Sequence, residues 1–117
     1  MNIESFREYC LSRKGATEEF PFGGDTLVFK VMGKMFALTD VEAFESVNLK
    51  VDPEEGARLR DQYDFVQPAY HMNKKHWITV VMGGKAPDKL VRLWIDQSYF
   101  LVTSGLTKSQ KLTLGIK

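Results

Sequence analysis

The clearest helical repeat in the chain lies near its C-terminal end and constrains what the rest can form. Side chains suited to a core recur there every three or four positions, at Leu90, Val91, Trp94, Ser98, Leu101 and Val102. This spacing predicts a long amphipathic helix that runs from residue 87 or 88 to Ser104 and is closed by Gly105. We expect it to be the main core helix of the domain, packed against strands formed by the shorter apolar runs.

A first hairpin is predicted in the N-terminal half of the chain. The β-rich runs at residues 26–32 and 35–39 are separated by Gly33 and Lys34. A two-residue Gly-X loop is typical of the type II′ turn that joins antiparallel strands. Alternation within the first run places Lys30 opposite the apolar side chains Leu27, Phe29 and Val31.

A third strand is predicted over residues 44–51. It has the pattern of a half-buried antiparallel strand, in which Val47, Leu49 and Val51 alternate with Ser46, Asn48 and Lys50. The polar side chains of this strand are expected to face water. Lys30 and Lys50 are therefore expected to share the solvent face of the sheet.

Two helices flank these strands, and both are indicated by their capping residues. Asn2 is a suitable N-cap for a helix over residues 2–14, and Asp52 is the N-cap of a second helix with a proline at its first position. Residues 16–25 are expected to form a linker between the first helix and the hairpin. Its two aromatic rings are expected to pack on the domain; they belong to Phe20 and Phe22.

The stretch at residues 68–77 reads PAYHMNKKHW and is interpreted as part of a second hairpin. Its strands are expected at residues 69–72 and 77–82, joined by a cationic loop of Asn73, Lys74 and Lys75.

The C-terminal tail after Gly105 is expected to form one short helical turn, with Thr107 as its N-cap.

Together these elements predict an α+β fold of order α-β-β-β-α-β-β-α, with an antiparallel sheet and helices packed on one face. The 117 residues suffice for one domain spanning 1–117 whose core needs no disulfide or metal. Cys10 is expected to be a buried structural thiol, with a reactive thiol as the alternative. Since no run resembles a signal peptide or a membrane span, a cytoplasmic location is expected.

Three motifs, PFGGDTLVFKVMGKMFAL, PAYHMNKKHW and SYFLV, occur in this order in the chain. They resemble the MmcQ/YjbR family of small bacterial proteins, and the resemblance covers nearly the whole chain. It implies a secretion-chaperone-like α+β fold, also compared with the frataxin homologue CyaY. The family is described as predicted DNA-binding proteins with a double-wing motif. The resemblance implies no catalytic or metal-binding residues.

The residues themselves favour a nonenzymatic binding protein with no cofactor and no metal. The hairpin tips can present cations to DNA phosphates; the candidate contacts are Lys34, Asn73, Lys74, Lys75 and His76, with Lys30 and Lys50 on the sheet face. Three or four lysines would give weak, salt-sensitive binding, with a salt slope of about −3. The alternative is that these lysines bind no ligand and only make an exposed turn soluble.

Two other hypotheses remain open from the sequence. One is a protein-interaction module that pairs with a copy of itself or captures a peptide, with no role for nucleic acid. The other is an enzyme that uses His71 with Asp25. Enzymatic function is the weaker hypothesis, because the serines lie in no nucleophile motif and the glycine pairs form no phosphate-binding loop.

Charge is distributed unevenly along the chain. Residues 1–64 hold 8 basic and 13 acidic side chains, whereas residues 65–117 hold 8 basic and 2 acidic side chains. The overall net charge of +1 therefore hides an acidic half and a basic half. This asymmetry becomes an argument about partners only if the fold gathers basic side chains on one surface.

Overall fold

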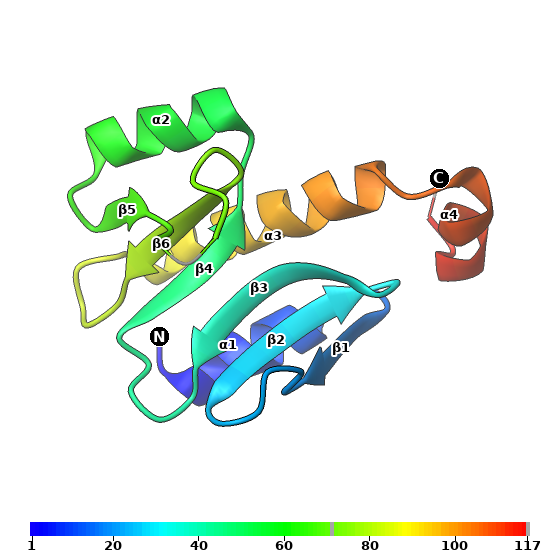
Figure 1. Cartoon of the computed structure of the whole chain (residues 1–117), viewed down its shortest axis with the longest axis horizontal. Helices are drawn as coiled ribbons and strands as arrows, with labels where there is room; N and C mark the ends of the chain where they lie inside the picture. The colour runs from blue at the N-terminus through cyan, green and yellow to red at the C-terminus, as the bar shows by residue number, and fades with distance from the viewer. Residues whose placement is uncertain (71, 117) are drawn as a thin grey trace.

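The computed structural model describes residues 1–70 and 72–116, and in these residues six antiparallel strands form one sheet (Figure 1). The strands are β1 (Ala16–Glu19), β2 (Thr26–Val31), β3 (Lys34–Asp40), β4 (Ser46–Lys50), β5 (Val66–Pro68) and β6 (Trp77–Val81). The helices are α1 (Ile3–Leu11), α2 (Pro53–Gln62), α3 (Asp88–Ser104) and α4 (Lys108–Leu114). The predicted α+β class and antiparallel sheet are confirmed.

Helices α1, α2 and α3 pack on one face of the sheet and leave the other face open, while α4 lies beyond the end of the sheet (Figure 1). The strand order is β1-β2-β3-β4-β6-β5. The main core joins the covered face to the helices through residues such as Phe6 of α1, Leu59 of α2 and Val91 of α3. Figure 1 shows α1 and α3 behind the sheet and the connection between β5 and β6 in front of it. The solvent-facing side chains of the strands therefore lie on this open face.

Capping side chains set the start of three helices where the sequence predicted them. Asn2 Oδ1 accepts from the Ser5 backbone N–H at 2.8 Å at the start of α1. The Asp52 carboxylate accepts two backbone N–H groups at the start of α2, and Thr107 caps α4 in a capping box. These bonds satisfy donors that the first turn of a helix leaves without a partner. The tail forms a seven-residue helix rather than one short turn.

A β-bulge at Phe36 changes which side chains of β3 face the core. Phe29 pairs with Ala37 but Lys30 pairs with Met35, so Phe36 is an extra residue in β3. Phe36 and Ala37 are consequently both buried in the main core. Met35 packs instead on the open face, against a small cluster that includes Trp77.

Ser98 of α3 occupies a gap in the ladder between β3 and β4. The last paired residues at this end are Ala37 and Leu49, so Phe36 and Lys50 would form the next pair. The Ser98 hydroxyl instead donates to the Phe36 carbonyl oxygen and accepts from the Lys50 N–H at 2.8 Å. One fully buried side chain thereby replaces a ladder bond and ties both strands to the core helix.

We predict that Ser98→Ala destabilises the protein by about 2 kcal/mol, because it leaves the buried Phe36 carbonyl and Lys50 N–H without their partner. Ser104→Ala is the matched control, since that serine is exposed on the same helix and bonds only to the carbonyl of its own preceding turn. Urea unfolding of both variants measures the difference. Equal losses in the two variants would contradict the structural role of Ser98.

The segment predicted as a linker contains a strand. Ala16–Glu19 forms β1 and pairs with β2, from Ala16 opposite Val31 to Glu19 opposite Val28. This short acidic edge strand lacks apolar alternation, so its pattern did not indicate a strand. Its stabilising contacts are tertiary, including an ion pair of 2.6 Å between Glu18 and Arg7 of α1.

The expected packing of the Phe20 and Phe22 rings on the domain is wrong, since these side chains are 50% and 68% exposed.

Both hairpin connections differ from the prediction. The β2–β3 turn is centred on Met32 and Gly33, whose φ angles of 50° and 78° are both positive. This is the type I′ pattern rather than type II′, and Lys34 belongs to β3. In the second hairpin the first strand is β5, whereas residues 69, 70 and 72 of the predicted strand lie outside any strand. Pro68 has no N–H to donate, so the strand ends there.

No helix in the described part of the chain is long and apolar enough to cross a membrane.

Candidate functional site

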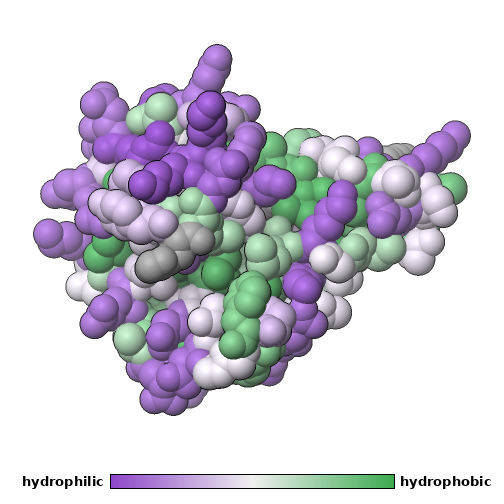
Figure 2. Space-filling view, in the orientation of Figure 1, coloured by the Kyte–Doolittle hydropathy of each residue, from purple (hydrophilic) through white to green (hydrophobic). Residues whose placement is uncertain are grey.

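The open face of the sheet carries two neighbouring hollows. The basic hollow, of about 580 Å³, is lined by Pro21, Phe22, Lys30, Gly33, Lys34, Met35, Lys50 and Trp77. The polar hollow, of about 610 Å³, is lined by Phe22, Thr26, Met35, Leu38, Thr39, Asp40, Ser46, Asn48, Met72 and Asn73. Because Phe22 and Met35 line both, we call the two together the sheet groove. Figure 2 shows this face, with apolar side chains around its centre and hydrophilic ones around them.

The three lysines of the basic hollow come from three strand ends that meet at one end of the sheet. Lys30 lies near the end of β2, Lys34 begins β3, and Lys50 ends β4 opposite Trp77. The prediction that Lys30 and Lys50 share the solvent face is confirmed by their common place in this lining. Lys34, predicted at a hairpin tip, joins them.

The lysines differ in how far they are already neutralised. Lys30 forms an ion pair with Glu19 of β1. Lys34 Nζ lies 3.5 Å from the Gly105 carbonyl oxygen, which is a weak contact. Within the described residues, Lys50 Nζ has neither an ion pair nor a hydrogen bond. Lys50 is thus the cation of this hollow that is most available to an anionic ligand.

The other predicted contact residues lie in the connection at residues 69–76. Asn73 lines the polar hollow, and its Oδ1 accepts from the Lys75 N–H at 2.9 Å, which shapes the turn. Lys74 Nζ lies 5.4 Å from the centre of the Tyr70 ring. Lys75 and His76 are exposed, and the linings of both hollows are formed by other residues. Their proposed DNA contacts remain predictions.

The polar hollow contains hydrogen-bonding groups that are only partly used by the protein. Thr79 Oγ1 donates to Asn48 Oδ1 at 2.6 Å, and this bond does not use the two N–H groups of the Asn48 side-chain amide. The Thr39 side chain lies on the covered face, because Thr39 pairs with Leu27 and Val47 of the main core, and its Oγ1 donates to the Ser46 carbonyl oxygen at 2.7 Å. Asn48 was predicted only as a wet-face residue of its strand. The apolar floor of this hollow was missed, because the bulge that exposes Met35 has no signal in the sequence.

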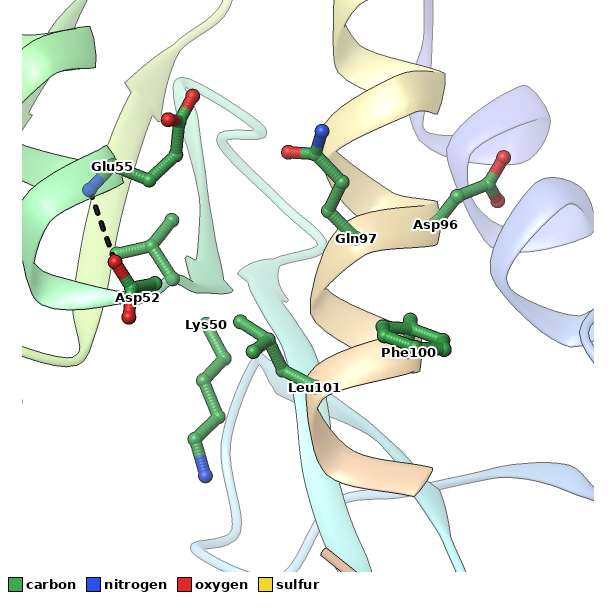
Figure 3. Close-up of a pocket in the computed structure, with 8 residues that line it drawn as sticks. Lys50, Asp52, Glu55, Asp96, Gln97, Phe100 and Leu101 are labelled. Atoms are coloured by element: carbon green, nitrogen blue, oxygen red, sulfur yellow. Dashed lines mark hydrogen bonds between the residues drawn. The ribbon is translucent and has the colours of Figure 1, made fainter. Parts of the chain in front are cut away.

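A third hollow, of about 470 Å³, lies between α2 and α3, and three carboxylates line it (Figure 3). Asp52 caps α2 and Glu55 pairs with Arg58. This hydrogen bond to Arg58 lowers the pKa of the Glu55 carboxyl. Asp96 points away from the hollow and accepts from Tyr9 at 2.8 Å. All three carboxylates are thus engaged in bonds to other described residues of the protein.

Burial governs the titration of the side chains behind the sheet. It raises the pKa of the Cys10 thiol, and Cys10 is fully buried, so the thiol stays protonated at neutral pH. Burial is also the main cause that raises the pKa of Tyr9, with its hydrogen bond to Asp96 next. The structural interpretation of Cys10 is therefore favoured over the reactive one.

His71 lies outside the described residues, so its suggested pair with Asp25 lies outside them as well. Within residues 1–70 and 72–116, no group of three or more His, Cys, Asp or Glu side chains is placed to hold a metal ion. Asp25 contributes its backbone to the start of the hairpin, where its carbonyl oxygen accepts from the Val41 N–H at 2.9 Å.

The charge asymmetry along the sequence does not correspond to the basic end of the groove. Lys30, Lys34 and Lys50 all belong to the acidic half of the chain. The basic half instead contributes Lys74 and Lys75, in the connection that enters β6 at the same end of the sheet. The cations are therefore gathered by strand register and not by their order in the chain.

Comparison with known proteins places the chain in a family. A sequence model of the YjbR family matches residues 11–101. The "uncharacterized protein YjbR" of Escherichia coli is 35% identical over 115 residues, which cover 97% of this chain and 98% of that protein. The chain belongs to the YjbR family. The "uncharacterized protein YbdF" of Escherichia coli O157:H7 is 41% identical over 90 residues, covering 76% of this chain and 74% of that protein.

Solved structures support the same assignment for this YjbR-family protein. A Deinococcus radiodurans protein with the domain named DUF419 superposes with a TM-score of 0.90 at 41% identity, over 99% of this chain and 89% of that one. A Pseudomonas syringae protein superposes with a TM-score of 0.74 at 32% identity, over 86% of this chain and 98% of that one. The resemblance inferred from the three sequence motifs is thus confirmed. None of these names states a ligand or an activity.

Proposed function

We propose that this YjbR-family protein is a nonenzymatic nucleic-acid-binding protein that uses the open face of its sheet. One observation carries the proposal: Lys30, Lys34 and Lys50, from three separate strands, line a single hollow together with Trp77 and Phe22. Cations beside the exposed ring of Phe22 suit a ligand that has both phosphates and bases, whereas Trp77 is buried. Lys74 and Lys75 extend the same positive end of the sheet.

The expected affinity is modest, because few cations are available. Lys30 already pairs with Glu19, which offsets part of its charge. Neutralising about three phosphates gives a salt slope of about −3 and a nonspecific dissociation constant of roughly 10⁻⁴ to 10⁻⁶ M. Such binding is lost readily as salt rises. Salt dependence is therefore the most informative property to measure.

We predict that the protein binds a fluorescent DNA oligonucleotide at about 50 mM salt and binds it roughly 40-fold more weakly at about 200 mM. Lys50→Gln removes the least neutralised cation of the hollow, so it reduces the slope by about one unit and weakens binding at low salt. Fluorescence anisotropy measures both quantities.

Lys89→Gln is the matched control, because Lys89 is an exposed lysine on α3 and lines a different surface hollow. It is expected to leave the slope unchanged. Absence of binding by the parent protein at low salt contradicts the proposal, and so does an equal effect of the two substitutions.

A second candidate function is protein association through α3. Leu93, Gln97 and Phe100 are exposed at positions that share one side of this helix, and Phe100 is 68% exposed between two hollows. An aromatic side chain beside surface hollows is a typical anchor of an interface. A second copy of the chain offers the same side chain and the same hollows, as a twofold interface requires.

We predict on this second hypothesis that the mass measured by light scattering rises with protein concentration and that Phe100→Ala prevents the rise. Leu112→Ala is the control, because Leu112 is 70% exposed on α4. A constant monomer mass in the parent protein would exclude self-association at these concentrations.

A further inference from the structure

The sheet groove has the size and continuity of a ligand site. Its two hollows, of about 580 and 610 Å³, each fall in the range of small-molecule pockets. They are continuous because Phe22 and Met35 line both. A ligand can therefore occupy both hollows at once, with different chemical groups in each.

Phe22 stands at the junction of the two hollows and presents its ring to solvent. It is 68% exposed, although it belongs to the lining of both hollows. The next two residues, Gly23 and Gly24, have positive φ angles of 70° and 58°. They turn the loop back toward β2 directly after the ring. An exposed ring at this place is a platform on which a flat heterocycle can stack.

The two ends of the groove differ in charge. The basic hollow contains Lys50, whose ammonium extends away from the carboxylates of Asp52 and Glu55 (Figure 3). The far side of the polar hollow contains Asp40, whose Oδ1 accepts from the Glu42 and Ala43 N–H groups at 2.9 and 3.1 Å. An anionic group is thus attracted to the basic hollow and repelled at the other end.

The polar hollow offers an amide donor that suits the edge of a base. The Asn48 amide nitrogen is left free to donate by the bond from Thr79 to Asn48 Oδ1. Leu38 and Met72 supply apolar surface beside this amide. Apolar walls with a few polar groups are typical of sites that bind a base outside its stack.

We propose that the sheet groove binds single-stranded nucleic acid, with a phosphate in the basic hollow beside Lys50 and one unstacked base against Phe22 in the polar hollow. A duplex can place a phosphate beside Lys50 but no base in the polar hollow, because its bases are paired and stacked inside the helix. This inference rests on the proposed nucleic-acid function and specifies which form of nucleic acid is bound.

The test compares a short single-stranded thymidine oligonucleotide with a duplex of equal length, at low salt, by fluorescence anisotropy. The single strand is expected to bind roughly tenfold more tightly. Phe22→Ala is expected to weaken binding of the single strand by about tenfold and to leave duplex binding unchanged. Lys50→Gln is expected to weaken both, because phosphates are common to both ligands.

Phe20→Ala is the matched control, because Phe20 is 50% exposed in the same loop while the described linings of both hollows are formed by other residues. It is expected to bind like the parent. Equal effects of Phe20→Ala and Phe22→Ala, or equal affinity for single strand and duplex with an intact response to Lys50→Gln, overturn the single-strand inference alone. Failure of the parent protein to bind either ligand overturns the proposed function as well.

Discussion

The interruption between β3 and β4 at Ser98 is the feature on which the candidate site depends. In an unbroken ladder, the Lys50 N–H would bond directly to the Phe36 carbonyl. The Ser98 hydroxyl bonds to both groups instead, and it is fully buried. The strands are therefore held to α3 at the point where they stop pairing with each other. The basic hollow lies over this end of the sheet and has lining residues from both sides of the gap.

The bulge at Phe36 acts together with this gap. It places two consecutive side chains of β3 in the core and turns Met35 to the open face. Met35 then links the two hollows, and the type I′ turn before it brings Lys34 to the same end as Lys50. Through Ser98, α3 is thus bonded directly to the strand backbones at this end of the groove. The groove is a consequence of how the sheet meets its core helix.

Much of the fold follows from local patterns, because those patterns reflect burial and capping. The repeat in α3, the caps at Asn2 and Asp52, and the alternation around Lys30 are each visible in the sequence. β1 was missed because an acidic edge strand is stabilised by its neighbours and not by its own apolar residues. The exposure of Phe22 was also missed, since composition favours burial of such a ring.

The candidate site was only partly predictable for the same reason. The alternation of side chains placed Lys30 and Lys50 on one face. Their proximity to Lys34 depends on the order of the strands in the sheet, which no local sequence pattern contains. Asn48 was predicted only as a wet-face residue of its strand, and its role follows from the bond with Thr79 across the β4–β6 pair. Long-range pairing is therefore what turns separate surface residues into a possible site.

The most direct test of the central claim is amide chemical-shift mapping during titration with a single-stranded thymidine oligonucleotide. If the sheet groove is the binding site, the largest shifts fall on strand and loop residues of the open face, including Lys30, Asn48 and Lys50. Shifts concentrated on α3 around Leu93 and Phe100, with the open face unchanged, would contradict this role of the groove.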